Sequence, residues 1–146
     1  MRTRLLVLLA LVLAGSAAGI ATAASQAPRS TLTVRSSAYG KILFDGRGRA
    51  LYAFTRDPRG RSVCNGACAE AWPPYIVPGR PGASRGVKPG LLGTTRRAGG
   101  KLQVTYAGRP LYYYVGDTKP GQVRCQNVRE FGGLWLVMRP DGRLVR

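Results

Sequence analysis

The sequence predicts an all-β fold, a small sandwich or barrel of about seven short strands from two duplicated hairpin units. The prediction depends on three observations. The chain resembles itself at a fixed offset, and its apolar runs are short and separated by glycine-containing turns. In addition, the stretch of helix formers Ala67–Ala71 meets Pro73 and Pro74, which limits it to one short helical turn.

The internal repeat appears without gaps when residues 40–57 are laid on residues 100–117. Seven pairs are identical, where about one is expected by chance. They are Gly40/Gly100, Lys41/Lys101, Gly48/Gly108, Arg49/Arg109, Leu51/Leu111, Tyr52/Tyr112 and Asp57/Asp117. With small shifts the correspondence continues through Cys64/Cys125 and Trp72/Trp135. We therefore define repeat 1 as about 39–93 and repeat 2 as about 99–146, within one β-rich domain of residues 31–146.

Seven apolar-rich runs are expected to form strands, because each is bounded by turn residues. They are Thr31–Val34, Lys41–Phe44, Ala50–Thr55, Leu102–Tyr106, Leu111–Val115, Leu134–Met138 and Leu144–Val145. Prolines and glycines are expected to keep residues 74–93 out of the sheets.

Aromatic side chains recur at alternate positions of the second strand in each repeat. Tyr52 and Phe54 in repeat 1, and Tyr112 and Tyr114 in repeat 2, are therefore expected to line one sheet face. We favour a role for them in the core over a ligand-stacking platform. The two tryptophans are each expected to cover one end of this core.

The N-terminus has the pattern of a Sec-type signal peptide, residues 1–24. A basic start is followed by the apolar run 5–13 and by small residues, with cleavage expected after Ala23 or Ala24. Residues 25–30 are expected to be a disordered tether. Because Cys64 is the first cysteine, no lipidation site follows the apolar run. We expect a secreted protein, extracellular or periplasmic, without a lipid or transmembrane anchor.

Charge gives the clearest indication of a partner class. The chain has 23 Lys and Arg against 6 Asp and Glu, and loss of Arg2 and Arg4 with the signal peptide leaves +15. Such a surplus favours an anionic envelope polymer or polysaccharide as partner. The residues expected to bind it cluster in turns: Arg47, Arg49, Arg56, Arg59, Arg61, Arg96 and Arg97. The absence of histidine removes the commonest metal ligand and general base, so we expect no metal, no cofactor and no catalytic residue.

Three cysteines in an oxidising compartment leave one thiol unpaired or bridged to another chain. We favour a disulfide between Cys64 and Cys68, which Asn65 and Gly66 separate by a tight turn, with Cys125 as a buried free thiol. The alternative is a bridge from Cys125 to either of the other two, closing a long loop.

Asp57 and Asp117 allow two interpretations. Each stands where a turn needs a side-chain acceptor for backbone amides, which we favour. Alternatively, the duplication brings the two carboxylates together to bind a cation or share a proton.

These motifs resemble those of bacterial secreted repeats of unknown function, mostly predicted lipoproteins, marked by a Yx(FWY)xxD signature. The signature occurs here as Tyr52-Ala53-Phe54-Thr55-Arg56-Asp57 and as Tyr112-Tyr113-Tyr114-Val115-Gly116-Asp117. The resemblance implies an envelope or secreted module with no established reaction. The missing lipidation cysteine distinguishes this chain from the lipoprotein members.

Together these patterns predict a secreted, non-enzymatic binding module for an anionic polymer or polysaccharide. The first alternative is a redox or metal-handling protein that uses its cysteines. The second is a wall-polymer hydrolase that uses Asp57 and Asp117, for which the carboxyl groups must lie within about 10 Å of each other in a cleft.

Overall fold

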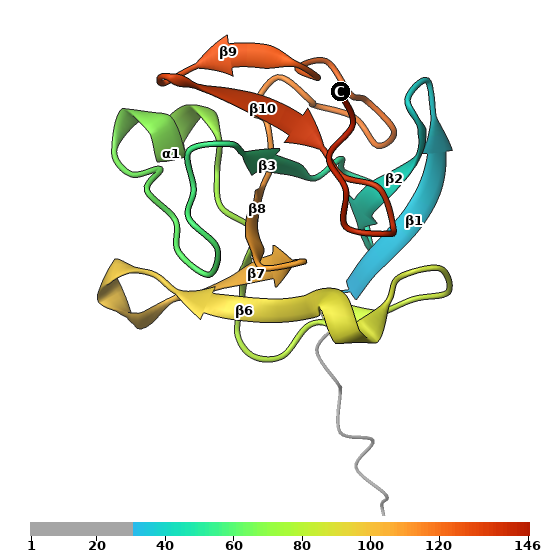
Figure 1. The fold of residues 1–146 in the computed structure, drawn as a ribbon, viewed down its shortest axis with the longest axis horizontal. Helices are drawn as coiled ribbons and strands as arrows, with labels where there is room; N and C mark the ends of the chain where they lie inside the picture. The colour runs from blue at the N-terminus through green and yellow to red at the C-terminus, as the bar shows by residue number, and fades with distance from the viewer. Residues whose placement is uncertain (1–30) are drawn as a thin grey trace, which may run out of the picture.

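The structure is a computed structural model that describes residues 31–146, so the predicted signal peptide, its cleavage site and the tether lie outside the described residues. Residues 31–146 form ten strands, one α-helix and two 3-10 helices (Figure 1). The strands are β1 (Thr31–Ser37), β2 (Gly40–Asp45), β3 (Tyr52–Phe54), β4 (Ile76–Val77), β5 (Gly82–Ala83), β6 (Leu92–Arg96), β7 (Leu102–Tyr106), β8 (Arg109–Tyr112), β9 (Val128–Glu130) and β10 (Gly133–Val137). The helices are α1 (Ala67–Ala71), η1 (Pro89–Leu91) and η2 (Ala98–Gly100).

The strands form two sheets that do not close on themselves, as expected for a sandwich and not for a barrel. The smaller sheet has the order β2-β1-β5, in which the β1–β2 hairpin is antiparallel. The larger sheet has the order β4-β7-β8-β3-β10-β9, and β6 also pairs with β7. The fold class predicted from the sequence is therefore confirmed.

The two repeats meet at the pairing of β3 with β8. These strands are antiparallel, and the equivalent residues Tyr52 and Tyr112 are direct partners. Because side chains alternate along a strand, this ladder divides the interior into two apolar clusters. Tyr52, Phe54 and Tyr112 enter a largely aromatic cluster with both tryptophans and the cysteines. Ala53 and Leu111 enter a second, mainly aliphatic cluster.

Tight turns position the strands of repeat 2. Ala107 and Gly108 connect β7 to β8, and both have positive φ, 50° and 74°. A two-residue hairpin loop of this kind matches the twist of the flanking strands, and glycine reaches it without steric cost. The predicted turn at Ala107 and Gly108 therefore sets the register in which Tyr106 faces Arg109.

Three details of the strand prediction were wrong. No strand was expected at β9, which pairs with β10 along its whole length. Residues 74–93 were expected to stay outside the sheets, but β4, β5 and the first two residues of β6 lie there. β4 and β5 fit between the prolines and β6 begins after Pro89, and β4 pairs only through Ile76 and Val77. The last predicted strand, Leu144–Val145, is reduced to an isolated bridge from Leu144 to Met138. Short edge segments of this kind lack the alternation that makes longer strands recognisable.

Candidate functional site

The signature residues form a symmetric set of hydrogen bonds across the junction of the repeats. The Tyr52 hydroxyl donates to Oδ2 of Asp117 at 2.7 Å, and the Tyr112 hydroxyl donates to Oδ2 of Asp57 at 2.6 Å. Each tyrosine thus binds the aspartate of the other repeat. We call these two pairs the crossed Tyr–Asp pairs.

The second oxygen of each aspartate holds the loop that follows it. Oδ1 of Asp57 accepts from the Val63 amide at 2.8 Å, and Oδ1 of Asp117 accepts from the Arg124 amide at 3.0 Å. The sequence predicted an acceptor for backbone amides, but the amides are six and seven residues further on. The turn after Asp57 is instead closed by a backbone bond from Arg61 to Pro58.

Burial sets the protonation of these groups. It raises the pKa of Tyr52 and of Tyr112, and the hydrogen bond to a carboxylate raises each further. Both phenols are therefore neutral donors at physiological pH. Burial also raises the pKa of Asp57, against the hydrogen bonds from Tyr112 and Val63 that lower it. Since both oxygens of Asp57 and of Asp117 have partners, the geometry gives no support to a cation site or hydrolase at these carboxylates.

The aromatic rings pack into one stack beside the crossed pairs. Trp72 and Trp135 lie face to face, with centroids 4.0 Å apart and planes 4° apart. Phe54 stacks on Trp135 at 4.2 Å, and Tyr114 lies on the other end against Trp72 at 4.7 Å. The expectation that each tryptophan covers a separate end of the core was wrong. Every stacked contact joins the two repeats, and sequence spacing alone does not reveal this.

The disulfide predicted from the sequence is present. Cys64 and Cys68 are bonded, with Cα atoms 5.3 Å apart, and Cys125 is a buried free cysteine. Burial raises the pKa of the Cys125 thiol, so it stays protonated and weakly nucleophilic at neutral pH. The closed disulfide and the neutral thiol give no support to a redox site.

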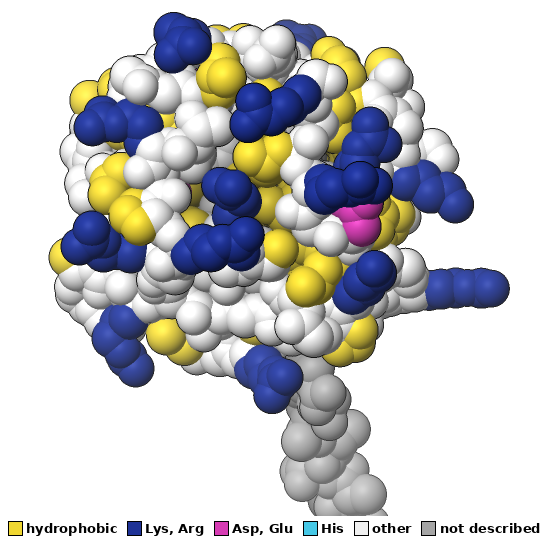
Figure 2. All heavy atoms as spheres, in the orientation of Figure 1, with side chains coloured by type: hydrophobic (Ala, Val, Ile, Leu, Met, Phe, Trp, Pro, Cys, Tyr) yellow, Lys and Arg dark blue, Asp and Glu magenta, His cyan; other side chains and the backbone are white. Residues whose placement is uncertain are grey.

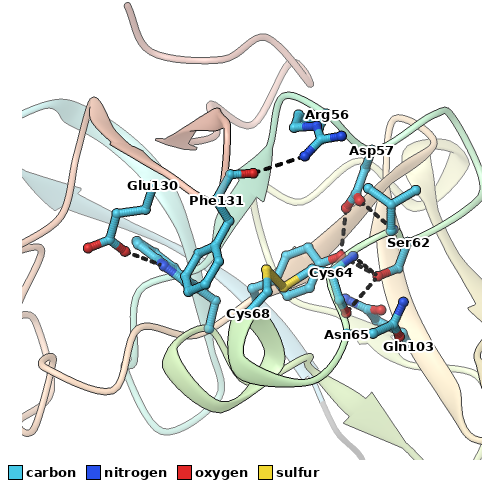
Figure 3. Close-up of a disulfide and its surroundings, with 12 residues drawn as sticks. Arg56, Asp57, Ser62, Cys64, Asn65, Cys68, Gln103, Glu130 and Phe131 are labelled. Carbon is cyan, nitrogen blue, oxygen red and sulfur yellow. Dashed lines mark hydrogen bonds between the residues drawn. A yellow bond between two sulfur atoms is a disulfide. The ribbon is translucent and has the colours of Figure 1, made fainter.

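Figure 3 shows the disulfide between Cys64 and Cys68 and the loop that carries it. The side chain of Arg97 fixes this loop. Arg97 donates from Nη2 to the Cys64 carbonyl at 2.7 Å and to Oδ1 of Asn65 at 3.0 Å. From Nη1 it donates to Oγ of Ser62 and to Oε1 of Gln103. Arg97, which the sequence suggested as a polyanion-binding residue, thus has its donors directed inward.

The other predicted arginines are distributed over several turns. Arg49 is half-buried over the Tyr113 ring, with its guanidinium carbon 4.6 Å from the ring centroid. The remaining five are exposed. Three of them also donate to a backbone carbonyl, Arg56 to Phe131, Arg59 to Ala107 and Arg96 to Gly100. Arg47 and Arg61 complete the exposed set.

Two acidic residues were missed by the sequence analysis. Asp45 is buried and accepts from the amides of Arg47 and Arg49 through Oδ1 and from the Tyr113 hydroxyl through Oδ2. Its place at the start of the turn 45–48 was the available signal. Glu130 accepts from Nε1 of Trp72 at 2.8 Å, and nothing in the local sequence indicates that contact.

The sequence profile of a family described as a secreted repeat of unknown function matches residues 33–75 and 93–139. The chain belongs to this family. Each matched segment overlaps one repeat and begins before it, and the two segments include both copies of the signature, residues 52–57 and 112–117. No curated protein and no solved structure shows significant similarity to the chain.

Two further findings concern residues 31–146 alone. No helix there is long and apolar enough to span a membrane. No group of three or more His, Cys, Asp or Glu side chains in the same range is arranged to hold a metal ion.

Proposed function

We propose that this member of the secreted-repeat family is a non-enzymatic extracellular or periplasmic module that binds an anionic envelope polymer through its exposed arginines. The observation that carries the proposal is the unequal distribution of charge between interior and surface. Of the six acidic residues in the chain, Asp45, Asp57 and Asp117 are buried and Glu130 is half-buried. Only Glu70 and Asp141 have exposed side chains.

Cations, in contrast, remain at the surface. Among residues 31–146 only Arg49, Arg97 and Arg109 are half-buried, and every other Lys and Arg is exposed. Figure 2 shows these basic side chains spread over a whole face, with little acidic side chain among them. The one ion pair that residues 31–146 contain joins Arg143 to Asp141 at 2.8 Å. A surface of this kind attracts polyanions over a distance comparable to the Debye length.

The buried signature residues support the same proposal, because their aromatic rings do not form a surface for a ligand. Tyr52, Phe54 and Tyr112 are 2% exposed or less, so their rings are covered by the protein itself. Tyr114 is half-buried against Trp72. These aromatic side chains therefore join the repeats, and the arginines are the groups that remain available to a ligand.

Chromatography tests the proposal. We expect the exported protein to elute from immobilised heparin well above about 0.15 M salt, with retention falling steeply as salt rises. An uncharged dextran column should not retain it. Elution from heparin at or below physiological salt contradicts the proposal.

A matched pair of variants separates the turn cluster from net charge. The variant R56Q/R59Q/R61Q removes three neighbouring cations, and R80Q/R124Q/R129Q removes three scattered exposed ones. We expect the first to flatten the salt dependence more than the second, because clustered cations contact the same stretch of polymer. If both variants show the same salt dependence of retention, binding depends on net charge and not on the turn cluster.

A further inference from the structure

One surface depression concentrates arginine. It has a volume of about 410 Å³ and is lined by Arg59, Arg109, Gly142, Arg143, Leu144 and Arg146. Two other depressions contain basic residues, beside Lys41 and Arg85 and beside Arg96 and Lys101, but cations are a minority of their lining. We call the first one the arginine depression.

Three chain segments, distant in sequence, are locked together to form it. The loop after β3 contributes Arg59, whose Nη1 donates to the Ala107 carbonyl at 2.6 Å, and the next amide, of Gly60, donates to Gly108 at 2.7 Å. The C-terminal turn packs on the same β7–β8 connection. A Cβ on Gly142 would come within 2.7 Å of the Ala107 Cβ, so this contact leaves no room for a side chain. The fold therefore sets the position of Arg59 and of the C-terminal turn that carries Arg143.

The guanidinium groups of Arg59 and Arg143 each donate a hydrogen bond from one nitrogen, and their other nitrogens keep donors for a ligand. Arg59 uses Nη1, and Arg143 uses Nε, which donates to Oδ2 of Asp141 at 2.8 Å. The side chain of Arg109 makes no hydrogen bond within residues 31–146. Side chains that are already ordered lose less conformational entropy on binding a ligand. The held side chains of Arg59 and Arg143 thus keep donors for an anion. Asp141 lies beside Arg143, and the charge of Arg109 also acts on the buried Asp57 carboxylate.

The lining identifies the chemistry of the ligand. The planar guanidinium fork matches tetrahedral and planar oxyanions, and phosphate is one of its preferred partners. None of the six lining residues is aromatic. Bound single-stranded nucleic acid stacks its bases on aromatic side chains, and such a platform is missing from this lining. The site therefore suits a phosphate group in a flexible chain without bases.

We propose that the arginine depression binds a phosphate group of a phosphodiester-linked polymer, an inference that rests on the proposed polyanion-binding function. Arg109 and Arg143 contact the phosphate oxygens from two sides, and Arg59 contributes its free donors. Neighbouring phosphates of the same chain lie on the exposed cations around the depression.

The test measures affinity by isothermal titration calorimetry at fixed salt, with poly(glycerol phosphate) and, separately, inorganic phosphate as probes. We expect R109Q/R143Q to weaken poly(glycerol phosphate) binding about tenfold or more, since two charge-assisted contacts are lost. The matched control R124Q/R129Q removes the same charge from exposed positions and should change the affinity less than about threefold. Inorganic phosphate should bind more weakly than the polymer and at the same residues.

Mapping on the wild-type protein keeps the test independent of variant stability. Amide NMR shifts on addition of poly(glycerol phosphate) should be largest at Gly108 and Gly142. Equal losses in both double variants, or shifts centred beside Lys41 or Arg96, overturn the site while leaving the proposed function intact. Binding of inorganic phosphate as tight as that of the polymer overturns the polymer assignment. If heparin retains the protein but poly(glycerol phosphate) does not bind, the phosphodiester class of ligand is wrong and the proposed polyanion binding stands.

Discussion

Repeat 1 and repeat 2 use equivalent residues in equivalent contacts, but they support these contacts differently. Tyr52 and Tyr112 both bind the aspartate of the other repeat, and Trp72 and Trp135 both pack against an aromatic ring of the other repeat. In repeat 1 the loop after the aspartate is closed by the Cys64–Cys68 disulfide, whereas repeat 2 retains Cys125 as a free thiol.

The tryptophan nitrogens differ as well. Nε1 of Trp72 donates to Glu130, while Nε1 of Trp135 is buried without a hydrogen-bond partner in residues 31–146. A buried donor without a partner costs free energy. The duplicated residues thus form the junction in the same way in both repeats. The features that differ between the repeats, the disulfide and the partner of the tryptophan nitrogen, determine how strongly each junction residue depends on its neighbours.

The largest expected effect is the loss of either tryptophan. Trp72→Ala and Trp135→Ala each empty a fully buried position, and each should lower the free energy of unfolding by about 3–5 kcal/mol.

The phenylalanine variants compare the two repeats. W72F leaves Glu130 without its donor, whereas W135F removes a donor that has no partner, so W72F should cost about 1 kcal/mol more. Denaturant unfolding measures both, and equal costs contradict the difference.

The disulfide should have the next largest effect. The variant C64S/C68S opens a small loop, for which the chain-entropy relation gives a loss of about 2 kcal/mol. C125A should cost less, because it removes only one sulfur atom from the aromatic cluster. Thermal unfolding of both variants measures the difference. Peptide mapping of the non-reduced protein is the control, and a disulfide-linked peptide containing Cys125 would overturn the assignment.

The two aspartates should respond unequally to Asn. The Tyr112 hydroxyl lies 2.6 Å from Oγ of Ser62 as well as from Asp57, so it keeps an acceptor in D57N. For the Tyr52 hydroxyl, Asp117 is the side-chain acceptor within residues 31–146. We expect D117N to cost about 1–2 kcal/mol and D57N less than about 1 kcal/mol. Urea unfolding of both variants decides, and a larger loss in D57N contradicts this ranking.

Much of this architecture follows from the sequence because it depends on local patterns. The register of β7 with β8 follows from Ala107 and Gly108, and α1 has the predicted bounds. The β3–β8 pairing and the exchange of partners across it depend on contacts more than fifty residues apart, and no local pattern contains that information. The same holds for the arginine depression. Arg109 and Arg143 belong to no run of cations, and only the packing of three loops brings them beside Arg59.

The smallest expected effect is a pH dependence specific to Asp57. Its pKa is raised in the folded protein by burial, so between the unfolded value of about 3.9 and the higher folded value the native state binds more protons. The stability contributed by this group therefore falls as pH rises through that window. D57N lacks the titration, so its stability should improve relative to wild type as pH rises above about 4.

Asp141 provides the control of opposite sign. Hydrogen bonds from the Arg143 amide and side chain lower the pKa of its carboxyl, so its contribution is present above the unfolded pKa and is lost as pH falls through the folded one. D141N should therefore lose stability relative to wild type as pH rises from about 3 to 5. Urea unfolding at constant ionic strength across this range measures both variants. A D57N curve parallel to wild type would show that the buried carboxyl titrates as it does in the unfolded chain.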